Sequence, residues 1–568
     1  MHTFLKKGLI LPFFAIILTV PLFSALIRPG FFPMQDDLQA FRVEQMVKCL
    51  KDFQIPCRWI PDMGYQYGYP QFNFYPPSVF YLGGILNLTG IQIIDAVKIL
   101  FILGSIASTA TMFIFLNAFF NQNQSQEKFK IGSWAAFIGA LLYSYVPYKA
   151  AEIYVRGSLS EFWTFVFFPL IFWSLLQVIR LGKFKYVSFL AISTGFLLIT
   201  HNLMSFIFLP IAGIWSISLI IILNKWKMFP KVIIGVILGL GLAAFFTIPV
   251  IFEGKFVHLE TLKGGYFDYR QHFVDLNQLF LSNHFGYGSS QLGPNDDLSL
   301  SVGIIHWTTG LVAILLTIMI FKKDKKLAIL VWIMGICELI VLFLMHQKSS
   351  LIWDKLSPLS WLQFPWRFLS DSTFILSFLG AIGVFIIGNF KKKLGIIAGL
   401  IIIISIFILH VSFFQPKSWF NISDSDKFSG SLWEKQLTIS IFDYLPIYAK
   451  FPPTQKAPDY PEVLNGKVEF INYKKGSNYQ IGEINAVSNS ILRLPLFDFP
   501  GMEVTIDQKK VNHWHDDCRN EKFCLGLITF DVLQGKHKIE ARFKDTNIRI
   551  ISNIITLGSG ILVLGLFF

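Results

Sequence analysis

The sequence predicts a polytopic α-helical membrane protein with a β-rich domain near its C-terminal end. The chain has 568 residues, of which 53% are hydrophobic and only 15% are charged, whereas about 25% are charged in an average soluble protein. Apolar runs of about 20 residues alternate with short basic loops, as in membrane-spanning helices. From residue 415 to 548 this pattern gives way to a polar region with short, alternating segments.

The first apolar run follows Lys6 and Lys7 and ends near Ile27. A cleaved signal peptide has the same features. The run is longer than the apolar core of most signal peptides, which favours an uncleaved first helix. In both interpretations the segment that follows lies outside the cytoplasm.

The first outer loop, residues 28–95, contains two predicted juxtamembrane helices. From Leu38 to Phe53 apolar residues recur at helical spacing, which is typical of an amphipathic helix on a membrane surface. The segment Ser78–Gly90 is apolar but too short to cross a bilayer. The alternation of basic loops is satisfied only if Ser78 to Lys130 makes one net crossing, so we expect a second juxtamembrane helix there.

Between these two helices, aromatic residues alternate with Gly and Pro, which excludes a regular helix. Such rings form either an aromatic belt at the membrane surface or platforms that stack on sugar rings, and composition favours the belt. The candidate stacking residues in this loop and in a later one are Trp59, Tyr65, Tyr67, Tyr69 and Trp366.

The predicted topology places the N-terminus in the cytoplasm, because the basic loops then all lie on the cytoplasmic side. A membrane domain of residues 1–414 precedes an extracytoplasmic domain of residues 415–548, which we expect to be a small β-sandwich. A final helix, residues 549–568, returns to the membrane. The helices, about twelve in all, are approximately 8–27, 96–120, 131–147, 161–180, 186–201, 204–223, 231–251, 303–321, 327–345, 368–388, 394–414 and 549–567.

The net charge of +13 does not indicate a nucleic-acid-binding protein. Basic and acidic residues nearly balance within residues 415–548, so the positive excess lies in the membrane part. There it is concentrated in short loops, as the positive-inside rule describes. We therefore expect a multi-pass protein of the cell membrane.

Four of the five cysteines lie in regions predicted to be extracytoplasmic. Cys49 and Cys57 are in the first outer loop, and Cys518 and Cys524 are in the C-terminal domain. Each pair is compatible with a disulfide in an oxidising compartment and equally with free thiols. Cys337 lies within a predicted helix, where packing explains it.

The first candidate for chemistry is the adjacent pair Asp36 and Asp37, just outside the first helix. In such a pair, one carboxylate can bind a divalent cation while the other accepts a proton from a hydroxyl group. The alternative is structural, because an aspartate before Leu38 is a good helix N-cap. Asp37 fits the N-cap better, so Asp36 is the first candidate for a catalytic base.

A second candidate is the short outer loop that contains Glu152, Arg156 and Glu161. Arg156 is suited to bind a lipid phosphate, and the two glutamates are candidates for binding an acceptor or a metal. An internal Arg–Glu ion pair in an interfacial loop is the structural alternative. His201, between two predicted helices, is a further acceptor or metal candidate, although a lone histidine at a helix turn is usually structural.

A third candidate is Arg367, which begins a helix at the outer surface within Trp361–Phe368. An arginine there can bind phosphate through two hydrogen bonds. The dipole of the helix N-terminus also favours a bound anion. The alternative is an arginine that reaches lipid headgroups. No Cys/His spacing typical of a metal site is present.

These stretches resemble the GT-C superfamily of membrane glycosyltransferases, which use polyprenyl-phosphate sugars. The resemblance is carried by one helix followed by Asp36-Asp37 in a long outer loop, and by Tyr75-Pro76-Pro77-Ser78 before an apolar helix. More narrowly, the chain is similar to a prokaryotic family labelled "membrane protein, 6-pyruvoyl-tetrahydropterin synthase-related". This resemblance is carried by Arg58–Asp62, Gly64–Pro70, Phe72–Pro77, Tyr148–Glu161 and Leu362–Arg367. That label does not imply pterin chemistry, because the chain has no histidine cluster for the zinc site which pterin synthases need.

The resemblance implies an enzyme that moves a sugar from a polyprenyl-phosphate donor to an extracytoplasmic glycan, lipid or protein. It implies an acid in the first outer loop, carried here by Asp36 or Asp37. In some relatives a second acid helps to bind metal, and Glu152 matches that position loosely, so a divalent cation is the one cofactor to consider. Two other classes stay open: a non-catalytic, membrane-anchored glycan-binding protein, and a transporter of lipid or polysaccharide.

Overall fold

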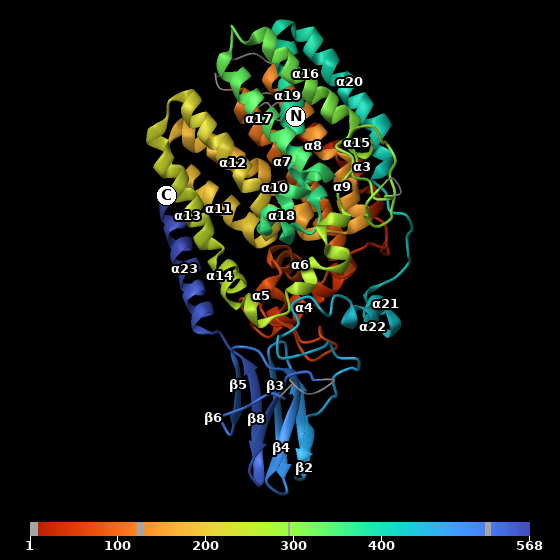
Figure 1. The fold of residues 1–568 in the computed structure, drawn as a ribbon, viewed down its shortest axis with the longest axis vertical. Coiled ribbons are helices and arrows are strands. Elements are labelled where there is room, and N and C mark those ends of the chain that lie inside the picture. The colour runs from red at the N-terminus through yellow and green to blue at the C-terminus, as the bar shows by residue number, and fades with distance from the viewer. Residues whose placement is uncertain (1–9, 122–129, 294–295, 517–523, 568) are drawn as a thin grey trace.

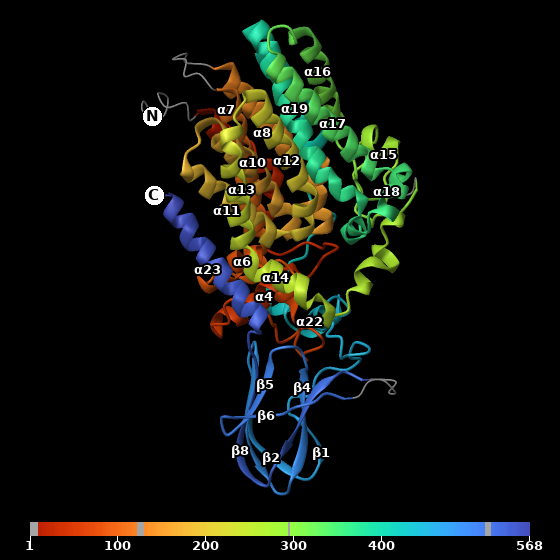
Figure 2. The ribbon, with the colours of Figure 1, turned by 60° about the vertical axis from the view of Figure 1, so that its left-hand side comes forward.

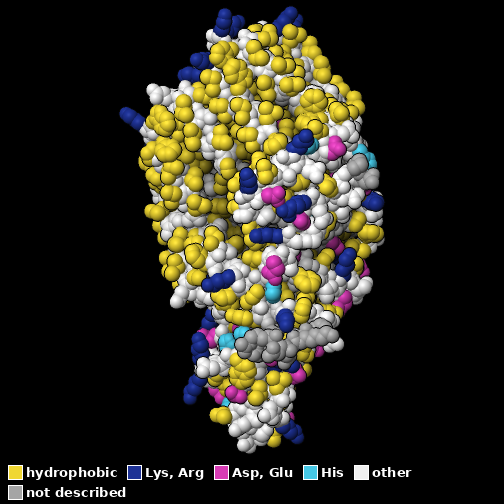
Figure 3. Space-filling view, viewed as in Figure 1, with side chains coloured by type: hydrophobic (Ala, Val, Ile, Leu, Met, Phe, Trp, Pro, Cys, Tyr) yellow, Lys and Arg dark blue, Asp and Glu magenta, His cyan; other side chains and the backbone are white. Residues whose placement is uncertain are grey.

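The computed structural model describes residues 10–121, 130–293, 296–516 and 524–567. The molecule is elongated, with a helical bundle at one end and β-strands at the other (Figure 1). Hydrophobic side chains cover the upper and left-hand parts of the visible face, while charged side chains lie at its top, over its lower right-hand part and on the strands (Figure 3). This distribution is that of a multi-pass membrane protein with a domain outside the bilayer.

Seven of the described helices are long and apolar enough to cross a membrane, or eight if the pair bent by 69° around Ala243 is one span. The prediction of twelve spans is therefore not confirmed. Four other predicted spans fall on shorter apolar helices, and 17 residues of helix extend only about 26 Å. The bundle helices are α2 (Ile10–Ile17), α3 (Val20–Phe23), α7 (Ile93–Phe120), α8 (Ile131–Ser144), α10 (Leu159–Leu181), α11 (Phe184–Thr200), α12 (Asn202–Leu223), α13 (Phe229–Leu242), α14 (Ala244–Glu253), α16 (Ile304–Ile320), α17 (Lys325–Met345), α19 (Leu369–Phe390), α20 (Lys392–His410) and α23 (Asn547–Phe567).

Short helices lie in the layer between the bundle and the strands and along the side of the bundle (Figure 1). Among them, α4 is the helix predicted after Asp37, and α6 is the predicted second juxtamembrane helix. The short helices are α4 (Gln39–Lys51), α5 (Gln71–Phe74), α6 (Ser78–Leu88), α9 (Pro147–Ala151), α15 (Leu276–Phe280), α18 (Ser350–Lys355), α21 (Asp424–Lys427) and α22 (Gly430–Thr438).

Helix α4 is buried on nearly every face, although its sequence predicts a helix on a membrane surface. The ring of Phe41 packs on Trp433 of α22, with centroids 5.4 Å apart. Next to α22, Asp424 of α21 accepts the backbone N–H groups of Ile93 and Ile94, which begin α7. The segment after α20 therefore covers α4 and fixes the start of α7, a long-range packing that the local pattern of α4 does not contain.

The strands form two antiparallel sheets (Figure 2). One has the order β1-β4-β7, and the other has the order β2-β3-β8-β5-β6. A turn at Asp507-Gln508 joins β5 to β6, and both residues have positive φ, as tight hairpin turns require. The strands are β1 (Glu462–Asn465), β2 (Val468–Lys475), β3 (Tyr479–Ala486), β4 (Ser490–Phe497), β5 (Met502–Ile506), β6 (Lys509–Val511), β7 (Leu527–Val532) and β8 (Gly535–Phe543).

A disulfide joins Cys49 in α4 to Cys57 in the loop that follows. The other predicted pair is not described, because Cys518 lies outside the described residues. Cys337 is buried in α17 as a free thiol.

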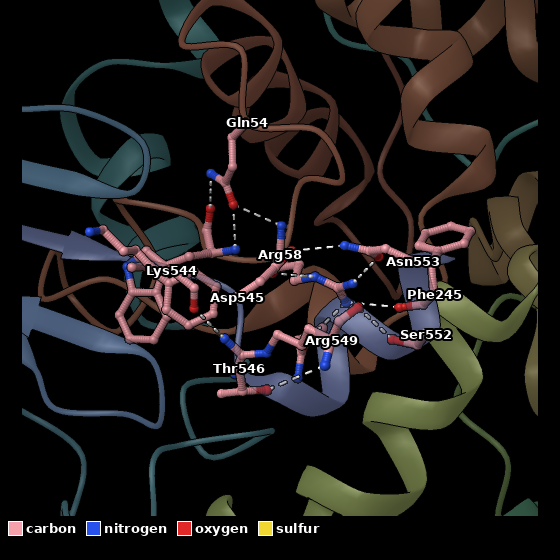
Figure 4. Close-up of polar contacts among 12 residues, drawn as sticks. Gln54, Arg58, Phe245, Lys544, Asp545, Thr546, Arg549, Ser552 and Asn553 are labelled. Carbon is pink, nitrogen blue, oxygen red and sulfur yellow. Dashed lines mark hydrogen bonds and ion pairs between the residues drawn. The ribbon is translucent and has the colours of Figure 1, made fainter. Parts of the chain in front are cut away.

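A buried polar junction ties the first outer loop, α14 and α23 to the strands. Arg58 binds Asp545 and Asn553 at the start of α23, and Arg549 lies beside them (Figure 4). The guanidinium of Arg549 donates to Glu253, at the end of α14, over 2.9 Å. Arg549 and Glu253 are 0% and 1% exposed, so each charge depends on the other for compensation.

We expect Glu253→Gln to lower the free energy of unfolding by about 3–5 kcal/mol, because Arg549 would lose its buried counter-charge. Denaturant or thermal unfolding in detergent measures the change. The control is Glu462→Gln, since Glu462 is 55% exposed and pairs with Arg493 at the surface. Its loss should be about 1 kcal/mol or less. Equal losses in the two variants would show that the junction does not hold the fold together.

Candidate active site

A cavity of about 1160 Å³ lies between the bundle and the layer of short helices. It collects side chains from segments that are hundreds of residues apart in the chain. Four apolar residues, Leu203 and Phe206 of α12 and Val250 and Ile251 of α14, line one side. The polar and aromatic lining includes Asp36, Arg42, Tyr75, Arg156, Glu161, His201, Trp366, Arg367, Asp443 and Tyr444.

Asp36 presents a carboxylate that is held in place but still accessible. Its backbone N–H donates to the carbonyl of Arg156, which fixes the first outer loop against the second. Arg42 and Gln39, both on α4, donate to Oδ2 of Asp36 over 2.8 and 2.7 Å. Arg42 is itself stacked 4.2 Å from the ring centroid of Tyr75. The Asp36 side chain remains 33% exposed, so one carboxylate is oriented by α4 and open to the cavity.

Asp37, although adjacent in sequence, points elsewhere. Both of its carboxylate oxygens lie 2.7 Å from Nζ of Lys427 on α21, and Asp37 is not among the described residues that line the cavity. The N-cap residue of α4 is Leu38, without a side-chain cap, so the predicted capping role for Asp37 is wrong. The structure separates the two acids: Asp36 faces the cavity and Asp37 anchors α21.

Arg156 and Arg367 share one buried carboxylate. Oε2 of Glu161 accepts from Arg156 over 3.0 Å and from Arg367 over 3.3 Å. Oε1 of Glu161 accepts the hydroxyl of Tyr148 over 2.7 Å. Trp366 lies under Arg156, with the guanidinium carbon 4.4 Å from the ring centroid. Two arginines from separate helical segments are thus presented together at the cavity wall.

Glu152 lies behind Arg156, in a π-helical turn (Glu152–Arg156), and is completely buried. It bonds to Arg156 but does not line the cavity within the described chain. Burial raises the pKa of Glu152, nearby Glu161 adds to the effect, and Arg156 opposes it. A raised pKa favours the protonated form of Glu152, which leaves the Arg156–Glu161–Arg367 group with an excess positive charge.

His201 caps the start of α12 and also reaches the cavity. Its Nδ1 accepts the N–H of Met204 over 3.2 Å, so a neutral ring carries its proton on Nε2. That nitrogen lies 4.0 Å from Oε2 of Glu161. Burial lowers the pKa of His201 to about 3, and the two nearby arginines act in the same direction. His201 is therefore a neutral hydrogen-bond donor beside the arginines.

Among the aromatic candidates, Trp366 lines the cavity. Trp59 is 1% exposed and packs on Phe499 and Phe543 of the β-rich region. Three further tyrosines lie outside the described lining and contact the segment 437–457 or the strands. These are Tyr65, Tyr67 and Tyr69.

Asp443 and Tyr444 are cavity residues that the sequence analysis did not find. They belong to the connection between α22 and the strands, where Ser440 and Tyr444 have φ values of 55° and 63°. Non-glycine residues in this region are uncommon and are often functional. The hydroxyl of Tyr69 binds the carbonyl of Ile441 over 3.0 Å and holds the connection in place. Tyr444 also stacks on Phe74, and the backbone of Ile447 donates to Phe256. These contacts join segments far apart in the chain, so no local sequence pattern indicates them.

The described residues contain no group of three or more His, Cys, Asp or Glu side chains arranged to hold a metal ion. Glu161 and His201 approach each other, but two arginines surround the glutamate. The divalent cation stays a prediction from the resemblance.

No family model matches the chain, and no curated protein matches it. A solved structure of the arabinofuranosyltransferase AftD from Mycobacteria is similar, with 12% identity and a TM-score of 0.45 over 73% of this chain and 27% of that chain. The oligosaccharyltransferase AglB from Archaeoglobus fulgidus, solved with an inhibitory peptide and a dolichol-phosphate, has 14% identity and a TM-score of 0.47. That match covers 80% of this chain and 62% of AglB. The chain thus spans about a quarter of AftD and less than two thirds of AglB.

Asp443 should make stability depend on pH in a predictable direction. Burial raises its pKa to about 6, and Arg42 opposes the effect, whereas an unfolded aspartate has a pKa of about 3.9. Between these pH values the folded state holds a proton that the unfolded state has released. The contribution of Asp443 to the free energy of unfolding therefore falls as the pH rises from about 4 to about 6.

Asp443→Asn should remove this dependence. Relative to the parent chain, the thermal midpoint of the variant should rise across that pH window, as measured by unfolding in detergent at several pH values. Asp459→Asn, at an exposed position, is the matched control and should follow the parent. Parallel curves for parent and Asp443→Asn would contradict the prediction.

Proposed function

We propose that this chain is a GT-C-type membrane glycosyltransferase that moves a sugar from a polyprenyl-phosphate donor to an extracytoplasmic acceptor. The observation that supports it is the composition of one cavity. A constrained, accessible carboxylate, two arginines and an apolar side are all parts of the same lining. A lipid-linked sugar phosphate has three parts that match this lining: an anomeric carbon that reacts with a hydroxyl group, an anionic phosphate and a hydrocarbon chain.

In this proposal the donor lipid enters from the side of the bundle. Phe206 of α12 and Ile251 of α14 line the cavity and are also 46% and 72% exposed on the bundle surface. A hydrocarbon chain between these helices would exchange its contacts with membrane lipid for contacts with apolar side chains. The phosphate would then meet Arg367 and Arg156, with the Nε2–H of His201 as an additional donor.

The reaction follows from the placement of Asp36. Its carboxylate accepts the proton of an acceptor hydroxyl, and the freed oxygen forms a bond to the anomeric carbon of the sugar. The bond from that carbon to the phosphate oxygen breaks, and its electron pair leaves with the polyprenyl phosphate. Attack from the face opposite the phosphate inverts the anomeric centre. Arg367 and Arg156 stabilise the charge that develops on the phosphate.

Two other side chains support the transfer without reacting. Arg42 holds the Asp36 carboxylate in one orientation, which places the base before the acceptor arrives. Trp366 fixes the plane of the Arg156 guanidinium and offers a ring face to a sugar. The β-rich region, on the same side of the bundle as the cavity, is suited to contact a glycan, lipid or protein acceptor outside the membrane.

One observation favours a transporter as the second candidate. Glu338 of α17 and Asp371 of α19 are buried within the bundle, and Ser372 donates to Glu338 over 2.5 Å. Buried acids within membrane helices often mark ion pathways. Neither acid lines the cavity in the described chain, however, so a transporter leaves the cavity itself unexplained.

Asp36→Asn should lower kcat for sugar transfer by at least about 100-fold, the usual contribution of a general base. The assay follows label transferred from a polyprenyl-phosphate sugar in membranes that contain a known amount of folded protein. Asp37→Asn is the matched control, because it removes the neighbouring acid that binds Lys427 outside the cavity. If both variants transfer label as well as the parent chain, the catalytic proposal is wrong.

Arg367→Ala should reduce kcat/KM by about 30- to 900-fold, as expected for the loss of a charge contact worth about 2–4 kcal/mol in the transition state. Donor binding, measured separately with labelled lipid, should weaken as well. Arg270→Ala, at a 59% exposed position, is the control and should leave both quantities unchanged. Unchanged donor affinity in Arg367→Ala would remove the phosphate-binding role.

A further inference from the structure

A second cavity, of about 500 Å³, lies at the end of the bundle opposite the strands. Helix α10 runs from the first cavity to the second. Glu161, near the start of α10, lines the first cavity, and Arg180, near the end of α10, lines the second. The intervening helix is about 28 Å long, close to the thickness of a bilayer's hydrocarbon core. The second cavity thus sits at the other membrane surface. Figure 3 shows Lys and Arg side chains at this end of the molecule.

The lining of this cavity combines three cations with one carboxylate. The cations are Lys130, Arg180 and Lys326, and the carboxylate is Asp324. Asp324 is already engaged, because its Oδ1 accepts the N–H of Leu327 over 3.0 Å and caps α17. Three cations against one carboxylate leave a net positive charge on the cavity wall.

Arg180 is half-buried and bonds only to neutral groups within the described chain. Its guanidinium donates to the carbonyls of Ala118, over 2.9 Å, and Phe119, over 3.5 Å, at the end of α7. No described carboxylate forms an ion pair with Arg180 or with the two lysines that share the cavity. A partly desolvated guanidinium of this kind is well suited to bind a phosphate oxygen.

Apart from Asn121, Gly132 and Asn389, the rest of the lining is apolar, and one side of it continues onto the outer surface of the bundle. Leu219, Ile222 and Leu223 of α12 face Leu327 and Leu330 of α17 across the cavity. On α12 the neighbouring Ile221 is 56% exposed on the bundle surface. This wall is too extensive for a free phosphate ion, which carries no hydrocarbon to cover it.

We propose that this cavity binds an anionic phospholipid, with its phosphate beside Arg180 and an acyl chain along α12 and α17. Lys326 and Lys130 complete the headgroup site. The site does not depend on the glycosyltransferase proposal, because it shares no lining residue with the first cavity. By sequence, the basic loops around it are the ones expected on the cytoplasmic side.

The test measures the thermal midpoint of the purified full chain in detergent during titration with one of three probes: phosphatidylglycerol, phosphatidylcholine or inorganic phosphate. Phosphatidylglycerol should raise the midpoint, because a ligand that binds the folded state stabilises it. The other two probes should leave the midpoint unchanged. An equal rise with phosphatidylcholine would overturn the charge-based site, and an equal rise with inorganic phosphate would overturn the lipid as ligand.

Single variants test the residues. Arg180→Gln and Lys326→Gln should each weaken phosphatidylglycerol binding about fivefold, since one basic residue near an anionic lipid contributes about 1 kcal/mol. Lys326 is exposed, and its side chain forms no hydrogen bond or ion pair among the described residues, so its variant keeps the test valid if Arg180→Gln folds poorly. Lys227→Gln, an exposed lysine outside the cavity, is the control and should bind like the parent. Unchanged affinity in Lys326→Gln would refute the proposed site.

Discussion

Glu253 is a buried carboxylate at a junction of three distant parts of the chain: the end of α14, which carries it, the first outer loop, and the start of α23. It accepts hydrogen bonds from Asn73 in the first outer loop, Thr546 before α23, and Arg549 within α23. Burying a charge is costly unless its partners are in place, so the junction forms only when all three segments have arrived. It fixes the last helix against the first loop and thereby sets where the strands sit below the bundle.

Ion pairs between buried side chains also organise the cavity. Each functional ion there is shared: Arg42 orients Asp36, and Glu161 holds Arg156 and Arg367 at once. Sharing keeps the side chains rigid while leaving an accessible carboxylate on one side and excess positive charge on the other. Such preorganisation is what a transfer reaction needs, because groups already in position cost no reorganisation in the transition state.

The two cavities, at opposite ends of the bundle, differ in how their charged side chains are arranged. At the strand side, opposite charges are paired and enclose a large cavity. At the far side, basic residues surround a smaller one in which no described carboxylate pairs with them. The first arrangement favours chemistry on a bound molecule, and the second favours a lasting contact with anionic lipid.

The sequence by itself determined the elements that depend on local pattern. Apolar runs indicated the bundle, period-two alternation indicated the strands, and the spacing after Asp37 indicated α4, because these signals reside in neighbouring residues. The sequence also placed Asp36, Arg156, Glu161, His201 and Arg367 among the candidates, and the tertiary structure brings them to one cavity. The sequence ranked Asp36 above Asp37 by giving Asp37 a helix cap, which the structure does not show. The tertiary structure separates the two acids through a lysine 390 residues further along the chain. It alone revealed Asp443, since the bond from Tyr69 that holds its segment joins residues 372 positions apart. Contacts over such separations depend on how helices pack, and packing leaves no period in the sequence.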